Sequence, residues 1–190
     1  MSNREDNPLT AGSDALLLRR FLEDGDEASF ETLFLRHYDM VYGVLYRLTG
    51  TREEAEDLAQ EVFMRLYRRR VRHDDNLAGW LYRVATNLGY NALRANHRRA
   101  NRERLAGATA DSPPIPGDEV ERVERRSRVR AALARLKPRE AKLLALREMG
   151  MSYRELADII GVAPGSVGTL LARAQRAFRE AYGAEEGKEA

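Results

Sequence analysis

The stretch SYRELADIIGVAPGSVGTLLARAQRAF, residues 152–178, decides the fold of this chain. It predicts a helix that begins with a capping box, in which the Ser152 hydroxyl accepts the backbone N–H of Glu155 and the Glu155 carboxylate accepts that of Ser152. Met151 and Leu156 are spaced to close a hydrophobic staple over this cap. Gly161 is expected to end the helix, because glycine adopts the left-handed C′ conformation at little cost.

Pro164 then predicts the start of a second helix, since proline is favoured at the first helical position. Apolar residues follow at spacings of three and four and predict its buried stripe: Val167, Leu170, Leu171, Ala174 and Phe178. Two helices joined by a short turn with a glycine are typical of a helix-turn-helix, whose second helix reads DNA. An ordinary helical hairpin has the same signals, so this stretch alone leaves both interpretations open.

Composition excludes several classes of function. The 190 residues allow one or two small domains. The absence of cysteine excludes disulfides, thiolate metal sites and cysteine catalysis, and the 3 histidines are too far apart in sequence for a metal site. We find no phosphate loop and no nucleophile–base pair, so neither a catalytic site nor a cofactor is expected. No apolar run has the length of a membrane span or of a signal-peptide core, and we expect a cytoplasmic protein.

Charge is unevenly distributed along the chain, although the net charge is only +2. Residues 1–63 carry 14 acidic and 6 basic side chains, whereas residues 65–104 carry 11 arginines and 3 acidic residues, and residues 128–179 carry 11 basic and 4 acidic residues. This pattern indicates two nucleic-acid surfaces and one separate protein-facing surface. Arginine dominates the basic residues and its planar fork suits phosphates and guanine edges, although a coding bias would look the same.

The apolar periodicity predicts an all-α fold of two small domains. After a disordered lead over 1–12, helices are expected to start at Ser13, at Asp26 and at a second capping box formed by Thr51 and Glu54. The outer face of the Thr51 helix changes from acidic to basic along its length. An ordinary solvent-facing helix has the same pattern, because these charges are favourable with its dipole.

A polar break precedes a further helix over 77–97, with Trp80, Leu81, Val84, Ala85 and Leu88 expected to be buried. The first domain therefore spans 13–97. A flexible, proline-rich linker is predicted over 98–124, a second helical domain over 125–182 and an acidic tail over 183–190.

Four stretches together carry a resemblance to a known family. They are AEDLAQEVFMRLYR (55–68), NLAGWLYRVATNLGYNALR (76–94), LKPREAKLLALREMGMSYRELADIIGV (136–162) and APGSVGTLLARAQRAFREAY (163–182). In this order they resemble region 2 and region 4 of bacterial RNA polymerase sigma factors of the extracytoplasmic-function (ECF) group, in the sigma-70 family. The resemblance implies binding to the clamp helices and flap of core RNA polymerase, recognition of promoter DNA and control by an anti-sigma factor.

The resemblance also implies three sets of site residues. The polymerase-binding set is Asp57, Leu58, Gln60, Glu61 and Phe63, although Phe63 can instead belong only to the core. The minus-10 set is Arg70, Val71, Arg72, His73, Trp80, Arg83, Asn87, Asn91 and Arg94, with Arg68 and Arg69 on phosphates. The minus-35 set is Ser152, Tyr153, Arg154, Ser166, Thr169, Arg173 and Arg176.

The sequence departs from the family at three positions. Val71 stands where many members have an aromatic residue, and Gly168 and Leu170 stand where many have a basic one. Two other functions therefore stay open. One is a self-sufficient DNA-binding regulator, which would need a dimer interface and a palindromic site. The other is a helical adaptor that has lost DNA reading.

Overall fold

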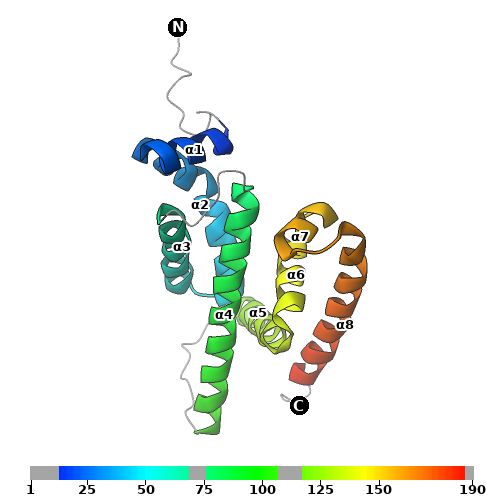
Figure 1. Ribbon diagram of the computed structural model, residues 1–190. Helices are drawn as coiled ribbons and strands as arrows, with labels where there is room; N and C mark the ends of the chain where they lie inside the picture. Colours follow the sequence, from blue (N-terminus) through cyan, green and yellow to red (C-terminus); the bar gives the residue numbers. More distant parts are fainter. Residues whose placement is uncertain (1–12, 69–75, 107–116, 187–190) are drawn as a thin grey trace.

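The computed structural model describes residues 13–68, 76–106 and 117–186, and within these ranges every element is a helix (Figure 1). This confirms the all-α fold class. The elements are α1 (Asp14–Asp24), α2 (Glu27–Thr49), α3 (Arg52–Tyr67), α4 (Leu77–Leu105), α5 (Gly117–Arg135), α6 (Pro138–Glu148), α7 (Tyr153–Ile160), the 3₁₀ turn η2 (Pro164–Ser166) and α8 (Val167–Glu186).

The first domain is built around α2, which packs against α1, α3 and α4. Its apolar residues lie at helical spacing and meet those of α3 and α4 in one core; the most deeply buried include Leu33, Val41, Leu45, Val62 and Leu81. Gly89 of α4 lies against α2, and a Cβ atom built on it would be 2.8 Å from Cδ1 and 3.2 Å from Cβ of Leu48. Helices α2 and α4 therefore pack so closely at this point that only a glycine fits without a shift of Leu48.

Helix caps follow the sequence signals at all but one of the predicted N-termini. The Ser13 hydroxyl accepts the backbone N–H of Leu16 at 3.3 Å, and an Asp26 carboxylate oxygen accepts that of Ala28 at 3.2 Å. The capping box predicted at Thr51 is wrong, since its side chain caps nothing. The Thr49 hydroxyl, at the end of α2, instead donates to the Thr51 carbonyl at 3.3 Å and stabilises the turn between α2 and α3.

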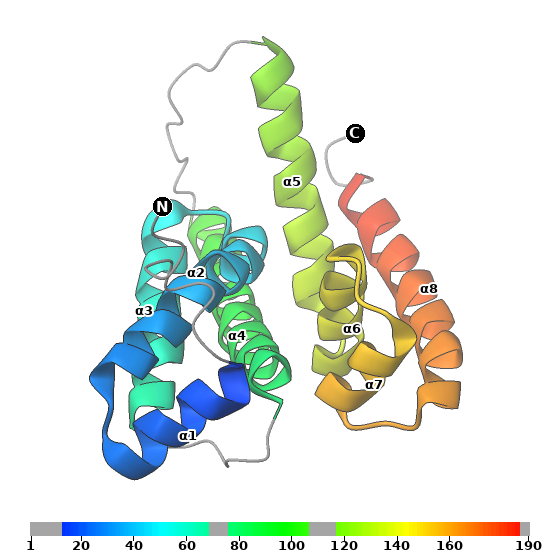
Figure 2. The same cartoon turned by 90° about the horizontal axis from the view of Figure 1, so that it is seen from above.

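The second domain packs α8 against both α5 and α6, while α7 crosses between α6 and the turn into α8 (Figure 2). The capping box of α7 is confirmed: Glu155 N lies 3.3 Å from Ser152 Oγ, and Ser152 N lies 2.8 Å from Glu155 Oε2. The Ser152 hydroxyl and backbone N–H donate to this carboxylate and hold the pKa of Glu155 below its ordinary value. Gly161 ends α7 with a φ of 71°.

Three expected boundaries differ from the structure. Pro164 begins the turn η2, and α8 starts only at Val167. Helix α4 continues past His97 to Leu105, and α5 already starts at Gly117, so much of the linker predicted over 98–124 is helical. Residues 98–105 lack an apolar stripe but consist largely of good helix formers, and extending an existing helix avoids the cost of nucleation. The predicted lead, residues 1–12, lies outside the described residues.

The two domains share apolar contacts in addition to the chain between them. Leu136 and Ala141 of the second domain belong to the same buried cluster as Tyr90 and Leu93 of α4. The Tyr90 hydroxyl donates to the Leu136 carbonyl at 2.5 Å. Helix α4 is therefore the common wall of both domains.

We predict that Gly89→Ala lowers the free energy of unfolding by about 1 kcal/mol. The new methyl group would clash with Leu48, and this clash costs more than the higher helix propensity of alanine contributes. Urea unfolding followed by circular dichroism measures the change. Gly183→Ala in α8 is the matched control, since nothing lies within 4 Å of its built Cβ. It should raise stability by about 0.5 kcal/mol, and equal effects of the two variants would contradict the packing argument.

Candidate polymerase and promoter interfaces

Helix α3 presents the residues of the predicted polymerase-binding set with very different exposure. Asp57 and Gln60 are exposed and Leu58 is half-buried. Glu61 is half-exposed and accepts from Arg65 Nε at 2.8 Å. Phe63 is only 3% exposed, and its ring meets that of Phe34 edge-on with centroids 4.7 Å apart. The core role that the sequence left open for Phe63 is therefore its principal one.

A groove of about 480 Å³ runs between α2 and α3, and three members of this set line it: Asp57, Gln60 and Phe63. It is lined by Phe30, Phe34, Tyr38, Glu56, Asp57, Gln60, Phe63, Met64 and Tyr67. Tyr67 and Met64 are partly exposed although they are large and apolar. An aromatic floor beside carboxylates suits a helix of another protein that carries an apolar stripe and basic neighbours.

The residues of the predicted minus-10 set on α4 include four on one face, because their spacing places Arg83, Asn87, Asn91 and Arg94 on successive turns. Arg83, Asn91 and Arg94 are exposed, whereas Trp80 is half-buried against the first domain's core. Arg68 is exposed at the end of α3. Five other members of the predicted DNA set lie outside the described residues: Arg69, Arg70, Val71, Arg72 and His73.

Asn87 is partnered by the second domain. Lys142 Nζ of α6 donates a hydrogen bond to Asn87 Oδ1. Both side chains are half-buried, and burial lowers the pKa of Lys142. The amide that the resemblance assigns to base reading is thus covered in this arrangement, a relation that no signal in the sequence gives.

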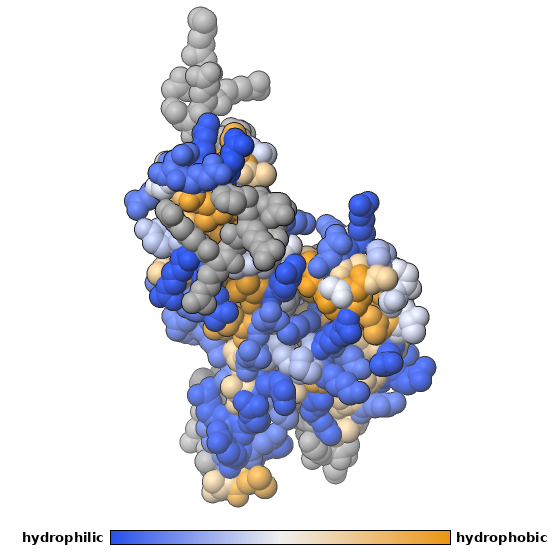
Figure 3. Space-filling view, in the orientation of Figure 1, coloured by the Kyte–Doolittle hydropathy of each residue, from blue (hydrophilic) through white to orange (hydrophobic). Residues whose placement is uncertain are grey.

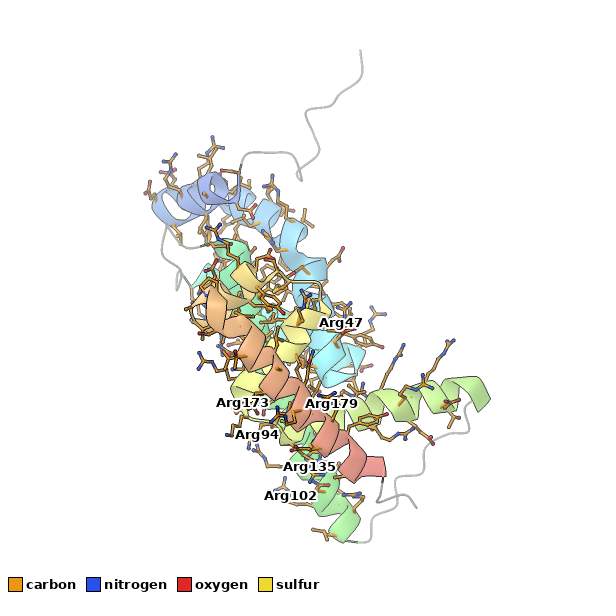
Figure 4. The ribbon with its side chains drawn as sticks, turned by 90° about the vertical axis from the view of Figure 1, so that its right-hand side faces the viewer. Arg47, Arg94, Arg102, Arg135, Arg173 and Arg179 are labelled. Atoms are coloured by element: carbon orange, nitrogen blue, oxygen red, sulfur yellow. The ribbon has the colours of Figure 1, made fainter. Side chains whose placement is uncertain are left out.

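The predicted minus-35 residues lie on α7, η2 and the first turns of α8. All are exposed: Ser152, Tyr153, Arg154, Ser166, Thr169, Arg173 and Arg176. Ser152 already uses its hydroxyl to cap α7. Figure 4 shows Arg173 and Arg179 projecting from α8.

The two departures on α8 have different structural settings. Leu170 is half-buried and packs against the core of the second domain, so an apolar side chain suits this position. Gly168 is half-buried, and a Cβ built on it would lie 3.6 Å from Tyr153 Cε2, an ordinary contact. Folding does not require a glycine there.

The sequence contains patterns that match two parts of one family. Sigma-70 region 2 matches residues 33–99, and Sigma-70 region 4 matches residues 126–177. The ECF RNA polymerase sigma factor SigM of Mycobacterium tuberculosis is 31% identical over 166 residues, which cover 86% of this chain and 81% of SigM. This chain is an ECF sigma factor of the sigma-70 family.

Further comparisons agree with this assignment. The ECF sigma factor SigE of Mycolicibacterium smegmatis is 32% identical over 167 residues, which cover 82% of this chain but only 63% of SigE. The solved structure of CnrH in complex with the cytosolic domain of CnrY has the same fold, with a TM-score of 0.62, 17% identity, and coverage of 90% of this chain and 97% of CnrH.

The two matched regions contain the surfaces described above. Region 2 includes the lining of the α2–α3 groove except Phe30, together with the polar face of α4. Region 4 includes α7, η2 and the first half of α8. Among the described residues, no single helix is long and apolar enough to cross a membrane; α7 and the segment Pro164–Ala184 reach that composition only as two helices that meet at 104°.

We predict that Arg173→Ala weakens promoter binding across sequences and reduces the slope of log affinity against log salt by about one unit, as loss of one phosphate contact does. Arg173 is exposed on α8, so folding should be unaffected. Fluorescence anisotropy of a labelled duplex at several salt concentrations measures the slope. Arg19→Ala removes the same charge from exposed α1 and should leave the slope unchanged; an unchanged slope for Arg173→Ala removes it from the phosphate-binding set.

Proposed function

We propose that this sigma factor docks on core RNA polymerase through the α2–α3 groove, opens minus-10 DNA with α4 and binds minus-35 duplex with α8. The observation that carries the proposal is the separation of these surfaces. Asp57 and Gln60 lie on α3, Asn91 and Arg94 on α4, and Arg173 on α8. A factor that binds a large enzyme and two DNA segments at once needs surfaces that do not overlap. Three separate helices meet this need.

The acidic rim of the groove supports docking through charge complementarity. Glu56 and Asp57 lie beside the aromatic floor, and carboxylates at the edge of an interface speed encounter with a basic partner and select its orientation. The apolar floor contributes affinity once water leaves it. In this role the sigma factor has no catalytic groups of its own, and polymerase carries out the chemistry in the cytoplasm.

The polar face of α4 supports capture of single-stranded DNA. Each asparagine amide offers both a donor and an acceptor, as the edges of unpaired bases do. Arg83 and Arg94 flank Asn87 and Asn91 on the same face, where guanidinium groups hold phosphates. Bases that leave the duplex are thus met by hydrogen-bonding groups between phosphate contacts, which offsets part of the cost of unstacking.

We propose an anti-sigma factor as a second protein partner, besides polymerase. CnrH was solved with the cytosolic domain of CnrY, and RpoE of Bartonella quintana was solved with the anti-sigma factor NepR. A protein that fills the α2–α3 groove of this chain would exclude polymerase from it.

Run-off transcription with bacterial core polymerase on a promoter library tests the function. Discrete start sites that share two upstream elements are expected with this protein and not without it. No starts, with the protein still co-eluting with core enzyme, would identify an adaptor. Neither starts nor co-elution would leave a self-sufficient DNA-binding regulator.

We predict that the double variant Asp57→Ala/Gln60→Ala weakens binding to core polymerase by about tenfold, equivalent to about 1.4 kcal/mol, because two exposed polar contacts are lost from the groove rim. Biolayer interferometry with immobilised core enzyme measures the dissociation constant. Glu53→Ala is the control, since Glu53 is exposed on the same helix but does not line the groove. An equal loss with Glu53→Ala would indicate nonspecific charge attraction.

A further inference from the structure

The C-terminal part of α4 carries a row of three arginines, Arg94, Arg98 and Arg102. They are four residues apart, so they lie on one face of the helix, and all three are exposed. At 1.5 Å per residue the row spans about 12 Å. Figure 4 shows Arg94 and Arg102 along this helix, and Figure 3 shows hydrophilic side chains gathered over its lower part. We call these three residues the arginine row.

The arginine row continues the polar face of α4 without a change of direction. Asn87, Asn91 and Arg94 lie on successive turns of that face, and Arg98 and Arg102 follow at the same spacing. Two members of the row, Arg98 and Arg102, lie in the part of α4 that the sequence assigned to the linker. Because this part is helical, the arginines keep a fixed spacing and direction relative to Asn91.

Like charges four residues apart destabilise a helix. The helix dipole favours Arg102, which lies in the last turn of α4, but folding does not explain Arg94 and Arg98, which lie farther from the C-terminus. Two other arginines of the same segment are held by the helix itself: Arg99 donates to Asn96 Oδ1 and Arg104 to Asn101 Oδ1, both at 2.7 Å. One acidic neighbour of the segment, Glu54 of α3, accepts from Asn96 on the opposite side of α4. The arginine row therefore presents positive charge that a polyanion would neutralise.

We propose that the arginine row is a third DNA-binding site, which holds consecutive phosphates of duplex DNA next to the segment bound by the rest of α4. Arginine suits this role, because its planar guanidinium pairs with two phosphate oxygens at once. A regular row at fixed spacing matches a regular strand of phosphates and reads no sequence. The site depends on α4 alone and stands whether or not the chain directs transcription.

The test is the salt dependence of duplex binding by the full-length protein. Arg98→Gln/Arg102→Gln removes two charges while retaining helix propensity, and circular dichroism verifies that α4 remains folded. Anisotropy of a labelled 30-base-pair duplex without polymerase should show a slope smaller by about two units, at about 0.9 per phosphate contact.

The control is Arg19→Gln/Arg20→Gln, which removes the same charge from two exposed positions of α1. It should leave the slope unchanged. An equal decrease in both double variants would show a general effect of net charge and overturn the site, as would no decrease in either. A decrease with single-stranded but not duplex DNA would also overturn it.

A different observation carries a second inference. The second domain holds α4 through two hydrogen bonds, from Lys142 to Asn87 and from the Tyr90 hydroxyl to the Leu136 carbonyl. It also contacts the end of α2, where the Arg130 guanidinium packs over Gly50. A Cβ on Gly50 would lie 2.5 Å from Arg130 Cζ, which shows how closely α5 covers the end of α2. We infer that this packed arrangement is autoinhibitory, because Lys142 occupies the Asn87 amide and the domains must separate before α4 can bind unpaired bases.

Labelling can follow this separation, since the chain has no cysteine of its own. Ala100→Cys in α4 and Ala172→Cys in α8 are exposed positions for a dye pair. In the free full-length protein, Lys142→Ala/Tyr90→Phe should lower energy transfer between the dyes and strengthen binding of a random single-stranded 12-mer pool several-fold. Lys137→Ala, which removes an exposed lysine at the start of α6, should change neither.

The two readouts separate this inference from the proposed function. Unchanged energy transfer would overturn the packed arrangement as the state of the free protein. Lower transfer without tighter single-strand binding would overturn autoinhibition. Neither result depends on polymerase, so run-off transcription can succeed or fail independently.

Discussion

The close packing of α4 against α2 is the contact on which the rest of this molecule depends. At Gly89 the two helices approach so closely that a methyl group would meet Leu48. This contact sets the rotation of α4, and therefore which of its faces points away from the first domain's core. Asn91 and Arg94 are exposed on the polar face because the opposite face is buried, whereas Asn87 on the same polar face meets Lys142 of the second domain. The second domain then packs against the same helix through Tyr90.

A sigma factor built on this helix can couple its two domains. In the packed arrangement Lys142 of the second domain is bonded to Asn87 of the first, while the arginine row beyond Asn91 stays exposed. Contacts with phosphates are thus available before contacts with bases. Such an order suits a factor that must first hold duplex DNA and then open it, since electrostatic contact with phosphates precedes sequence reading in most encounters of proteins with DNA.

Individual positions show how sequence reasoning succeeded and failed. Ser152 and Glu155 form the predicted capping box because both partners lie within one helical turn, where backbone geometry alone brings them together. Thr51 has the same motif, yet its hydroxyl is unused and Thr49 holds the turn instead. The helix over 98–105 was missed because its arginines give no apolar periodicity, which is the principal signal for helices in sequence.

Local order along the chain determined much of this protein: the all-α class, most helix caps and the helix-turn-helix rest on residues a few positions apart. The sigma-factor resemblance rests on four such local stretches in a fixed order. Tertiary structure alone decided three features: the hydrogen-bond partner of Asn87, the burial of Phe63, and the packing of the second domain against Tyr90. Each joins residues far apart in sequence, such as Asn87 and Lys142. Periodicity tells which face of a helix is apolar, but the element that covers that face is set by packing of the whole chain.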